Sequence, residues 1–145
     1  MPKFKLEPLL QHRKHIEDIF QRELAETVQA LTAEESALDQ LLADHDRIQN
    51  DLKEKLNDKI DAAEMLHFHK YLDELALEIN GQKTKVAEAE QKLELKRMEL
   101  TEAMKDRKIM DKLKDKQIAA EVDRLEKHEQ NFMNEIAISR HLRSR

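Results

Sequence analysis

Residues that interrupt helices are almost missing from this chain. It contains one glycine and two prolines in 145 residues, and both prolines, Pro2 and Pro8, lie near its beginning. Gly and Pro are the residues that most strongly interrupt regular backbone structure, whereas the abundant Leu, Ala, Glu, Lys and Gln favour helices. We therefore expect an all-α protein made of very long helices. Such a chain has little room for a pocket, so its function is expected to lie on helix faces.

The composition limits how these helices can pack. Charged and hydrophobic residues each make up 39% of the chain, which is too polar for a thick core and suits helices that share one narrow apolar seam. Without cysteine, neither disulfides nor thiolate metal sites can form. No signal peptide or membrane-spanning run is present, so we expect a soluble, cytoplasmic protein. The net charge of −5 does not favour nucleic acid as a partner.

Apolar residues recur at helical spacing in both halves of the chain. In the first half they are Leu6, Leu10, Ile16, Phe20, Leu24, Val28, Leu31, Leu38, Leu41, Ile48, Leu52 and Leu56. In the second half two interleaved heptad series occur: Leu72, Ile79, Val86, Leu93 and Leu100, and Leu75, Gln82, Ala89, Lys96 and Ala103. A further set continues with shifted phase: Met104, Ile109, Leu113, Ile118, Val122, Leu125, Phe132 and Ile136. Small and polar residues in the second series are typical of a two-stranded seam.

Two positions are candidates for the reversal of the chain. Asn57–Asp61 combines turn residues with an Asp-x-x-Glu sequence that resembles a capping box, and Asn80-Gly81 is the strongest two-residue turn signal. The heptad spacing passes through Gly81 unchanged, which favours the first position. The prediction is one coiled-coil domain over 1–145.

Within this domain we expect a helix over about 5–57, a turn over about 58–60, a helix over about 61–139 and a basic tail over 140–145. Folded as an antiparallel hairpin, the longer helix extends beyond the shorter one by roughly two dozen residues. A parallel homodimer of one unbroken helix is the competing architecture, because a single seam serves either arrangement.

Histidines and carboxylates were considered as possible metal ligands. His12 and His15 share a helix face, and Glu64 and His67 have the Glu-x-x-His spacing of carboxylate di-iron bundles. Those sites need two such motifs inside a four-helix core, and the motif occurs once here. We therefore expect solvent-facing histidines, with no metal, no cofactor and no catalytic residues. One glycine cannot form a phosphate-binding loop either, so the protein is not expected to be an enzyme.

Tyr71, the sole tyrosine, has Phe68 and Leu75 on the same helix face. Packing in the seam near the turn is one interpretation. The other is an exposed anchor for a partner, because aromatic residues are favoured in binding hot spots. Basic residues also gather in 105–116 and at Arg140, Arg143 and Arg145, where they could steer the chain towards an anionic surface or an acidic ring of subunits.

Four segments resemble the flagellar export protein FliJ family in order and spacing across nearly the whole chain. They are residues 4–13, 71–75, 110–114 and 129–137. The resemblance implies an antiparallel two-helix coiled coil of the bacterial flagellar type III export apparatus, located peripherally at the cytoplasmic face of the inner membrane.

The resemblance also implies partners. They are the hexameric export ATPase FliI, which receives the end bearing both termini, the export gate protein FlhA, and export chaperones. By correspondence with the family, the gate-contacting residues are Leu41, Ile48, Tyr71, Leu75 and Gln82, and the ATPase-contacting residues are Arg13, Arg124 and Lys127. His45 stands near a position where some members have an aromatic residue. A generic cytoplasmic coiled-coil scaffold or tether, acting as a structural homodimer, is the alternative function.

Overall fold

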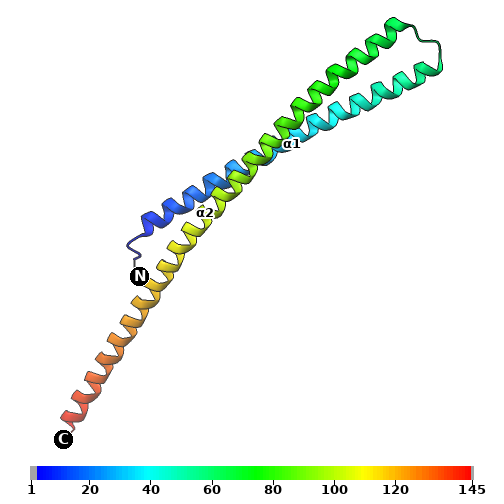
Figure 1. Ribbon diagram of the computed structural model, residues 1–145. Helices are drawn as coiled ribbons and strands as arrows, with labels where there is room; N and C mark the ends of the chain where they lie inside the picture. Colours follow the sequence, from blue (N-terminus) through cyan, green and yellow to red (C-terminus); the bar gives the residue numbers. More distant parts are fainter. Residues whose placement is uncertain (1–2, 145) are drawn as a thin grey trace. The chain divides into compact units, whose positions relative to one another are not determined.

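A computed structural model describes residues 3–144 of the chain. Within that part, the secondary structure consists of two helices, α1 (Glu7–Asn57) and α2 (Ala62–Arg143), joined by a short loop (Figure 1). The expected all-α hairpin of two long helices is confirmed. Helices of this length form because no proline follows Pro8 and Gly81 is the one glycine of the sequence. Almost no residue therefore removes a backbone donor or adds backbone freedom.

The chain reverses at the first of the two candidate positions. α1 ends at Asn57, and the backbone N–H of Glu64 donates to Oδ1 of Asp61 at 2.8 Å, so Asp61 caps the start of α2. Gly81 lies inside α2 and does not have a positive φ. A helix interior tolerates this glycine because the other residues of α2 are good helix formers.

The helix bounds differ slightly from the expected ones at three ends. α1 begins at Glu7 instead of about residue 5, and α2 begins at Ala62. α2 also continues through Arg143, so most of the expected basic tail over 140–145 is helical, while residue 145 lies outside the described part of the chain. Arg140, His141 and Arg143 occupy the last turn of α2, where cations interact favourably with the helix dipole.

Contacts within the chain group its residues into two compact units. The loop unit comprises residues 20–100, and the terminal unit comprises residues 1–19 and 101–145. Each unit draws one segment from each half of the sequence.

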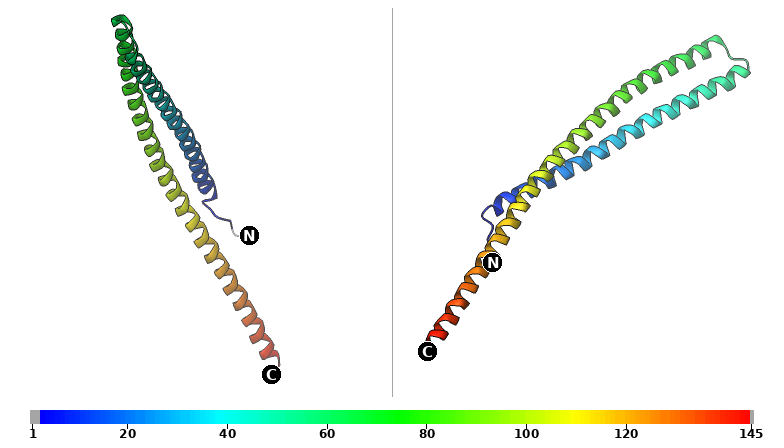
Figure 2. Two further views of the ribbon diagram at one scale, coloured as in Figure 1. Left: turned by 90° about the vertical axis from the view of Figure 1, so that its right-hand side faces the viewer. Right: turned by 60° about the horizontal axis from the view of Figure 1, so that its bottom comes forward.

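The loop unit is an antiparallel pair of helix segments, 20–57 of α1 and 62–100 of α2, which lie side by side in both views of Figure 2. The buried apolar side chains of its seam are Leu52 of α1 and Leu75, Ile79 and Leu93 of α2. Together with half-buried Leu72, Val86, Ala89, Lys96 and Leu100, they confirm the two heptad series of the second half. The seam is narrow, as the high proportion of charged residues predicted.

Three residues of the first-half series, Leu6, Val28 and Leu56, are exposed and do not lie in a seam. Val28 is 44% exposed, and the half-buried residue beside it is Thr27, whose hydroxyl donates to the carbonyl of Glu23 at 2.7 Å. Leu56 is also exposed. A strict heptad from Leu24 places position 27 in the seam and moves position 28 out of it, although valine is the more apolar residue.

In the terminal unit, the first turns of α1 lie along residues 101–117 of α2. Phe4, Leu10 and Met110 form a small buried cluster, and Nε2 of Gln117 donates to the carbonyl of Lys3 at 2.8 Å. Beyond that bond α2 continues to Arg143 with almost every side chain exposed. The predicted extension of the longer helix is therefore present.

Candidate interaction surfaces

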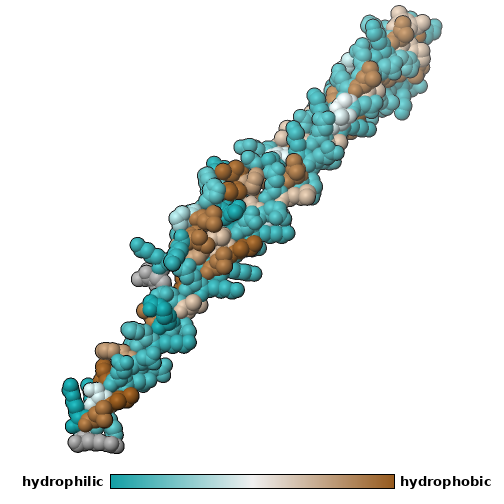
Figure 3. Space-filling model, turned by 60° about the vertical axis from the view of Figure 1, so that its left-hand side comes forward, coloured by the Kyte–Doolittle hydropathy of each residue, from teal (hydrophilic) through white to brown (hydrophobic). Residues whose placement is uncertain are grey.

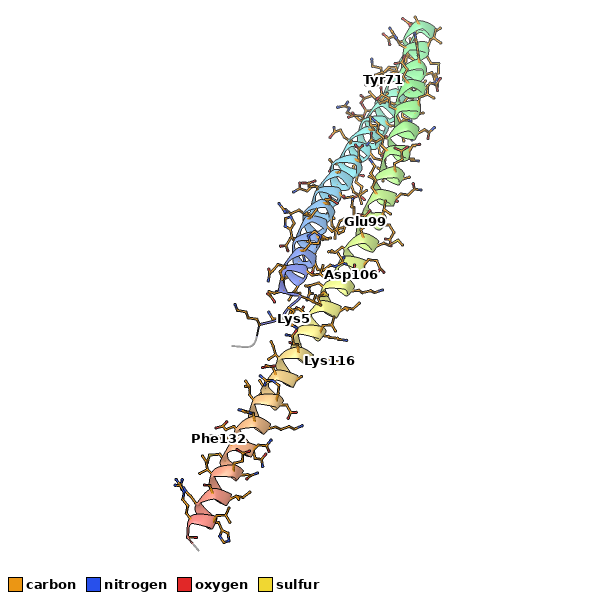
Figure 4. The ribbon with its side chains drawn as sticks, turned by 90° about the vertical axis from the view of Figure 1, so that its left-hand side faces the viewer. Lys5, Tyr71, Glu99, Asp106, Lys116 and Phe132 are labelled. Carbon is orange, nitrogen blue, oxygen red and sulfur yellow. The ribbon has the colours of Figure 1, made fainter. Side chains whose placement is uncertain are left out.

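A small aromatic surface lies on the loop unit, close to the chain reversal. Ile48 of α1 and His67, Phe68 and Tyr71 of α2 line a shallow hollow of about 250 Å³. Tyr71 is 45% exposed and projects from α2 in Figure 4. Nζ of Lys55 lies 5.2 Å from the centre of the Phe68 ring, a cation–π distance. We call Ile48, His67, Phe68 and Tyr71 the aromatic surface.

The residues matched to the family's gate-contacting face separate into accessible and covered ones. Tyr71 is exposed, whereas Leu41 and Ile48 are half-buried. Leu75 is 5% exposed and Gln82 is 9% exposed, so both belong to the seam. Two interpretations were open for Tyr71 and its neighbours, packing in the seam or exposure to a partner. Leu75 is packed in the seam, whereas Tyr71 is exposed.

Gln82 forms a polar layer across the seam of the loop unit. Its Nε2 donates to the backbone carbonyl of Glu34 at 2.9 Å and to the Glu34 carboxylate. A buried amide is costly unless it is hydrogen-bonded, and these two bonds provide its partners. Gln82 therefore joins the helices and is not available to a partner protein in this arrangement.

The histidines do not gather into a site. His12, His15, His67 and His69 are exposed, as expected, whereas His45 is half-buried at the heptad spacing of the seam. Among residues 3–144, no three His, Asp or Glu side chains converge as metal ligands would. His67 instead lines the hollow opposite Ile48 of α1, a neighbourhood that spacing along one helix could not reveal.

The three residues matched to the ATPase-contacting surface all form ion pairs. Arg13 of α1 lies 3.6 Å from Asp106 of α2. On α2, Arg124 lies 2.5 Å from Glu121, and Lys127 lies 3.2 Å from Asp123. The hydrogen bond from Arg124 lowers the pKa of the Glu121 carboxyl and, by the same contact, raises the pKa of Arg124.

These residues do not form one cluster. Asp106, the partner of Arg13, precedes Arg124 by about five turns of α2, on the order of 27 Å along the helix axis. The side chains of Arg124 and Lys127 are 65% and 73% exposed, and exposed ion pairs contribute little stability. Carboxylates of a partner could therefore replace their present partners at little cost.

An apolar stripe follows the last part of α2, and Phe132, labelled in Figure 4, is its largest side chain. Val122, Leu125, Phe132 and Met133 are between 44% and 60% exposed, and Ile118 and Ile136 are half-buried. Their spacing of three and four residues places them on one helix face. The sequence predicted these residues, apart from Met133, as a continued seam, but α1 does not reach them, so the stripe is exposed.

Two other members of the same shifted series are exposed for a different reason. Ile109 is 58% and Leu113 is 44% exposed, because the face of α2 that meets α1 here carries Arg107, Met110 and Lys114. Hydrophobic side chains consequently reach the surface in separate patches among hydrophilic ones, as the space-filling view shows (Figure 3). The hollows lined by Ala30 and Ala89, by Ile48 and Tyr71, and by Phe4 and Lys114 are open to solvent.

Neither α1 nor α2 is long and apolar enough to cross a membrane.

The chain was compared with proteins of known family and with solved structures. No curated protein matches the chain significantly. The solved structure of a candidate YscO homolog from Chlamydia trachomatis is similar, with a TM-score of 0.62, 25% sequence identity and 100% of both chains covered. The family model described as flagellar FliJ protein matches residues 2–145. The chain therefore belongs to the flagellar FliJ protein family and is a component of type III protein export.

Proposed function

We propose that this protein couples the hexameric export ATPase FliI to the export gate FlhA and also binds export chaperones, without catalysing a reaction itself. The membership of nearly the whole chain in the FliJ family is the observation that carries the proposal. Long helices with exposed apolar patches are consistent with binding of this kind. The protein would act peripherally at the cytoplasmic face of the inner membrane.

For the gate, we propose the aromatic surface as the contact site. Tyr71 supplies an exposed aromatic ring, and Ile48 and Phe68 supply the apolar floor beside it. Leu41 is half-buried one heptad before Ile48, whereas Leu75 and Gln82 are buried in the seam and do not line the surface. Aromatic residues that combine an apolar ring with a polar tip are enriched among binding hot spots.

Substitution of Tyr71 tests the gate contact, with Leu75 as the matched control. Tyr71→Ala should weaken binding to the purified cytoplasmic region of FlhA by about tenfold or more while the helix content stays unchanged. Leu75→Ala should lower the thermal stability as well, because Leu75 is buried in the seam. Unchanged gate binding by Tyr71→Ala would exclude the aromatic surface as the contact site.

For the ATPase, we propose that Arg124 and Lys127, together with the apolar stripe on the same part of α2, contact FliI, and that Arg13 takes part from α1. The double variant Arg124→Glu, Lys127→Glu should reduce binding to FliI and stimulation of its turnover at low salt. A matched control is Lys83→Glu, Lys92→Glu, which changes the same charge at exposed positions of the loop unit. Equal effects of both double variants would show that only net charge matters.

A further inference from the structure

Polar side chains occupy most of the α2 seam in the terminal unit. The seam positions of α2 there are Ala103, Arg107, Met110, Lys114 and Gln117. In the loop unit, by contrast, the polar seam residues of α2 are only Gln82 and Lys96 among the heptad positions from 68 to 100. Contacts that join the two helices therefore depend more on charge in the terminal unit than in the loop unit.

Ion pairs across the helices occupy these polar positions. Glu17 of α1, which is 7% exposed, accepts hydrogen bonds from the guanidinium of Arg107. About two helical turns after Arg107 on α2, Nζ of Lys114 lies 3.0 Å from Oε2 of Glu7. In both pairs the acid belongs to α1 and the base belongs to α2. Salt screens the half-exposed pair of Lys114 and Glu7 more strongly than the covered pair of Arg107 and Glu17. The covered pair contributes little net stability, because its desolvation offsets its attraction.

Separation of the helices would leave two of these four side chains with partners on their own helices. Arg107 also donates to Asp111 at 2.6 Å, one turn along α2. Glu7 also accepts a hydrogen bond from Gln11 at 3.0 Å, one turn along α1. An uncompensated buried charge normally makes the breaking of an ion pair costly. Here that cost is reduced, because all four released charges are hydrated and two of them, Arg107 and Glu7, retain a partner within their helix.

A small apolar cluster opposes the separation. Phe4, Leu10 and Met110 are the buried side chains that join α1 to α2 near the beginning of the chain, and Leu10 is fully covered. Ile109 and Leu113 contribute nothing to this contact, since they are exposed. The apolar contribution to the closed state is therefore confined to a few residues, and screening of the ion pairs can shift the balance.

We propose that residues 4–19 form a strap that opens from α2 as ionic strength rises, while the loop unit stays paired. Opening exposes Leu10 and Met110 in addition to Leu6 and Leu9, which are already exposed in the closed state. The strap is thus a salt-controlled cover over residues 103–117 of α2. The strap contains Arg13, one of the proposed contacts with FliI, but the inference itself rests only on the contacts between the two helices of the terminal unit.

Spin labels on the full chain test the strap directly, because the native sequence has no cysteine to interfere. A labelled pair at His12→Cys and Lys108→Cys reports on the terminal unit, and a pair at Gln40→Cys and Asn80→Cys reports on the loop unit. All four positions are exposed. Electron–electron distance distributions would be recorded at about 0.05 and about 1 M NaCl, where the Debye length falls to about 3 Å.

We expect the long-distance fraction of the 12/108 pair to rise about fivefold or more with salt, while the 40/80 distribution stays constant. A second measurement separates opening from simple fraying of the helix end. In the variant Glu7→Leu, Glu17→Leu, Arg107→Met, Lys114→Met the charges of both pairs are replaced by apolar groups, and the salt dependence at 12/108 should be reduced by at least half. Unchanged salt dependence in this variant, no salt effect in the native sequence, or parallel changes in both units would each overturn the proposal.

Discussion

Among single residues, Gly81 is the one whose conformation is most easily misread from sequence. Its position after Asn80 is a strong turn signal, yet it is helical, and a Cβ atom built on it meets no heavy atom within 4 Å. Whether the turn forms is decided by the surrounding seam, because reversal at Gly81 would separate Ile79 and Gln82 from their common face.

Gly81→Ala should therefore raise the free energy of unfolding by about 1 kcal/mol, since alanine restricts the unfolded chain and has higher helix propensity. For a protein of this size, the melting temperature should rise by about 3 °C. Thermal unfolding followed by circular dichroism checks this value. Lys83→Ala, at another exposed position of α2, is the control and should change the free energy of unfolding by less than about 0.5 kcal/mol. A lower melting temperature for Gly81→Ala would indicate that another contact requires glycine.

Glu7 makes the terminal unit sensitive to acid. The hydrogen bond from Gln11, followed by the contact with Lys114, lowers the pKa of the Glu7 carboxyl below its ordinary value of 4.5, and Lys14 acts in the same direction. A carboxyl whose pKa is lowered in the folded state stabilises that state above its unfolded pKa. That contribution is lost as pH falls from about 4.5 through the lowered folded pKa.

Amide hydrogen exchange of residues 7–19, corrected for the intrinsic effect of pH, should therefore become faster between about pH 5 and pH 3. In Glu7→Gln the carboxyl is absent, so part of this acid response should disappear. An identical acid response in the variant and the native sequence would show that other carboxylates control the terminal unit.

At the scale of helical segments, side chains of similar apolar character have very different surroundings along α2. Leu93 is 8% exposed in the seam of the loop unit, whereas Phe132 is 57% exposed in the last part of the helix. The difference arises because α1 covers the first position and does not reach the second. Hydropathy alone does not separate them.

Leu93→Ala should lower the free energy of unfolding by about 2–4 kcal/mol, because a buried leucine leaves a cavity and loses apolar contact. Phe132→Ala should change it by less than about 0.5 kcal/mol, because the ring is already in water. Chemical denaturation of both variants gives the comparison. Similar losses would mean that the stripe around Phe132 is covered in solution.

At the scale of the whole molecule, the seam of each unit is formed within a single chain. This pairing removes the need for the parallel homodimer that the sequence also allowed. Multi-angle light scattering should therefore give the mass of one chain at micromolar concentration. A stable mass of two chains would indicate that the exposed stripe of α2 or the seam itself joins two copies.

Much of the architecture could be predicted because it depends on local chemistry and regular spacing. The lack of helix breakers determined the long helices, Asp61 with Glu64 marked the start of α2, and the heptads through Gly81 located the seam of the loop unit. The site was less predictable: the family match indicated a surface that includes Tyr71, but not that Leu75 beside it is covered.

Only the tertiary structure decided which side chains of each helix are covered by the other helix. Thr27 takes a seam position beside exposed Val28, and Arg107 and Lys114 face α1 while Leu113 faces water. The physical reason is that burial of a helix face depends on its partner, and an ion pair across two helices stabilises a polar position only when both residues are in place. By itself, the sequence determined where helices could form and the chain could turn; pairing determined which of their faces remained available to other proteins.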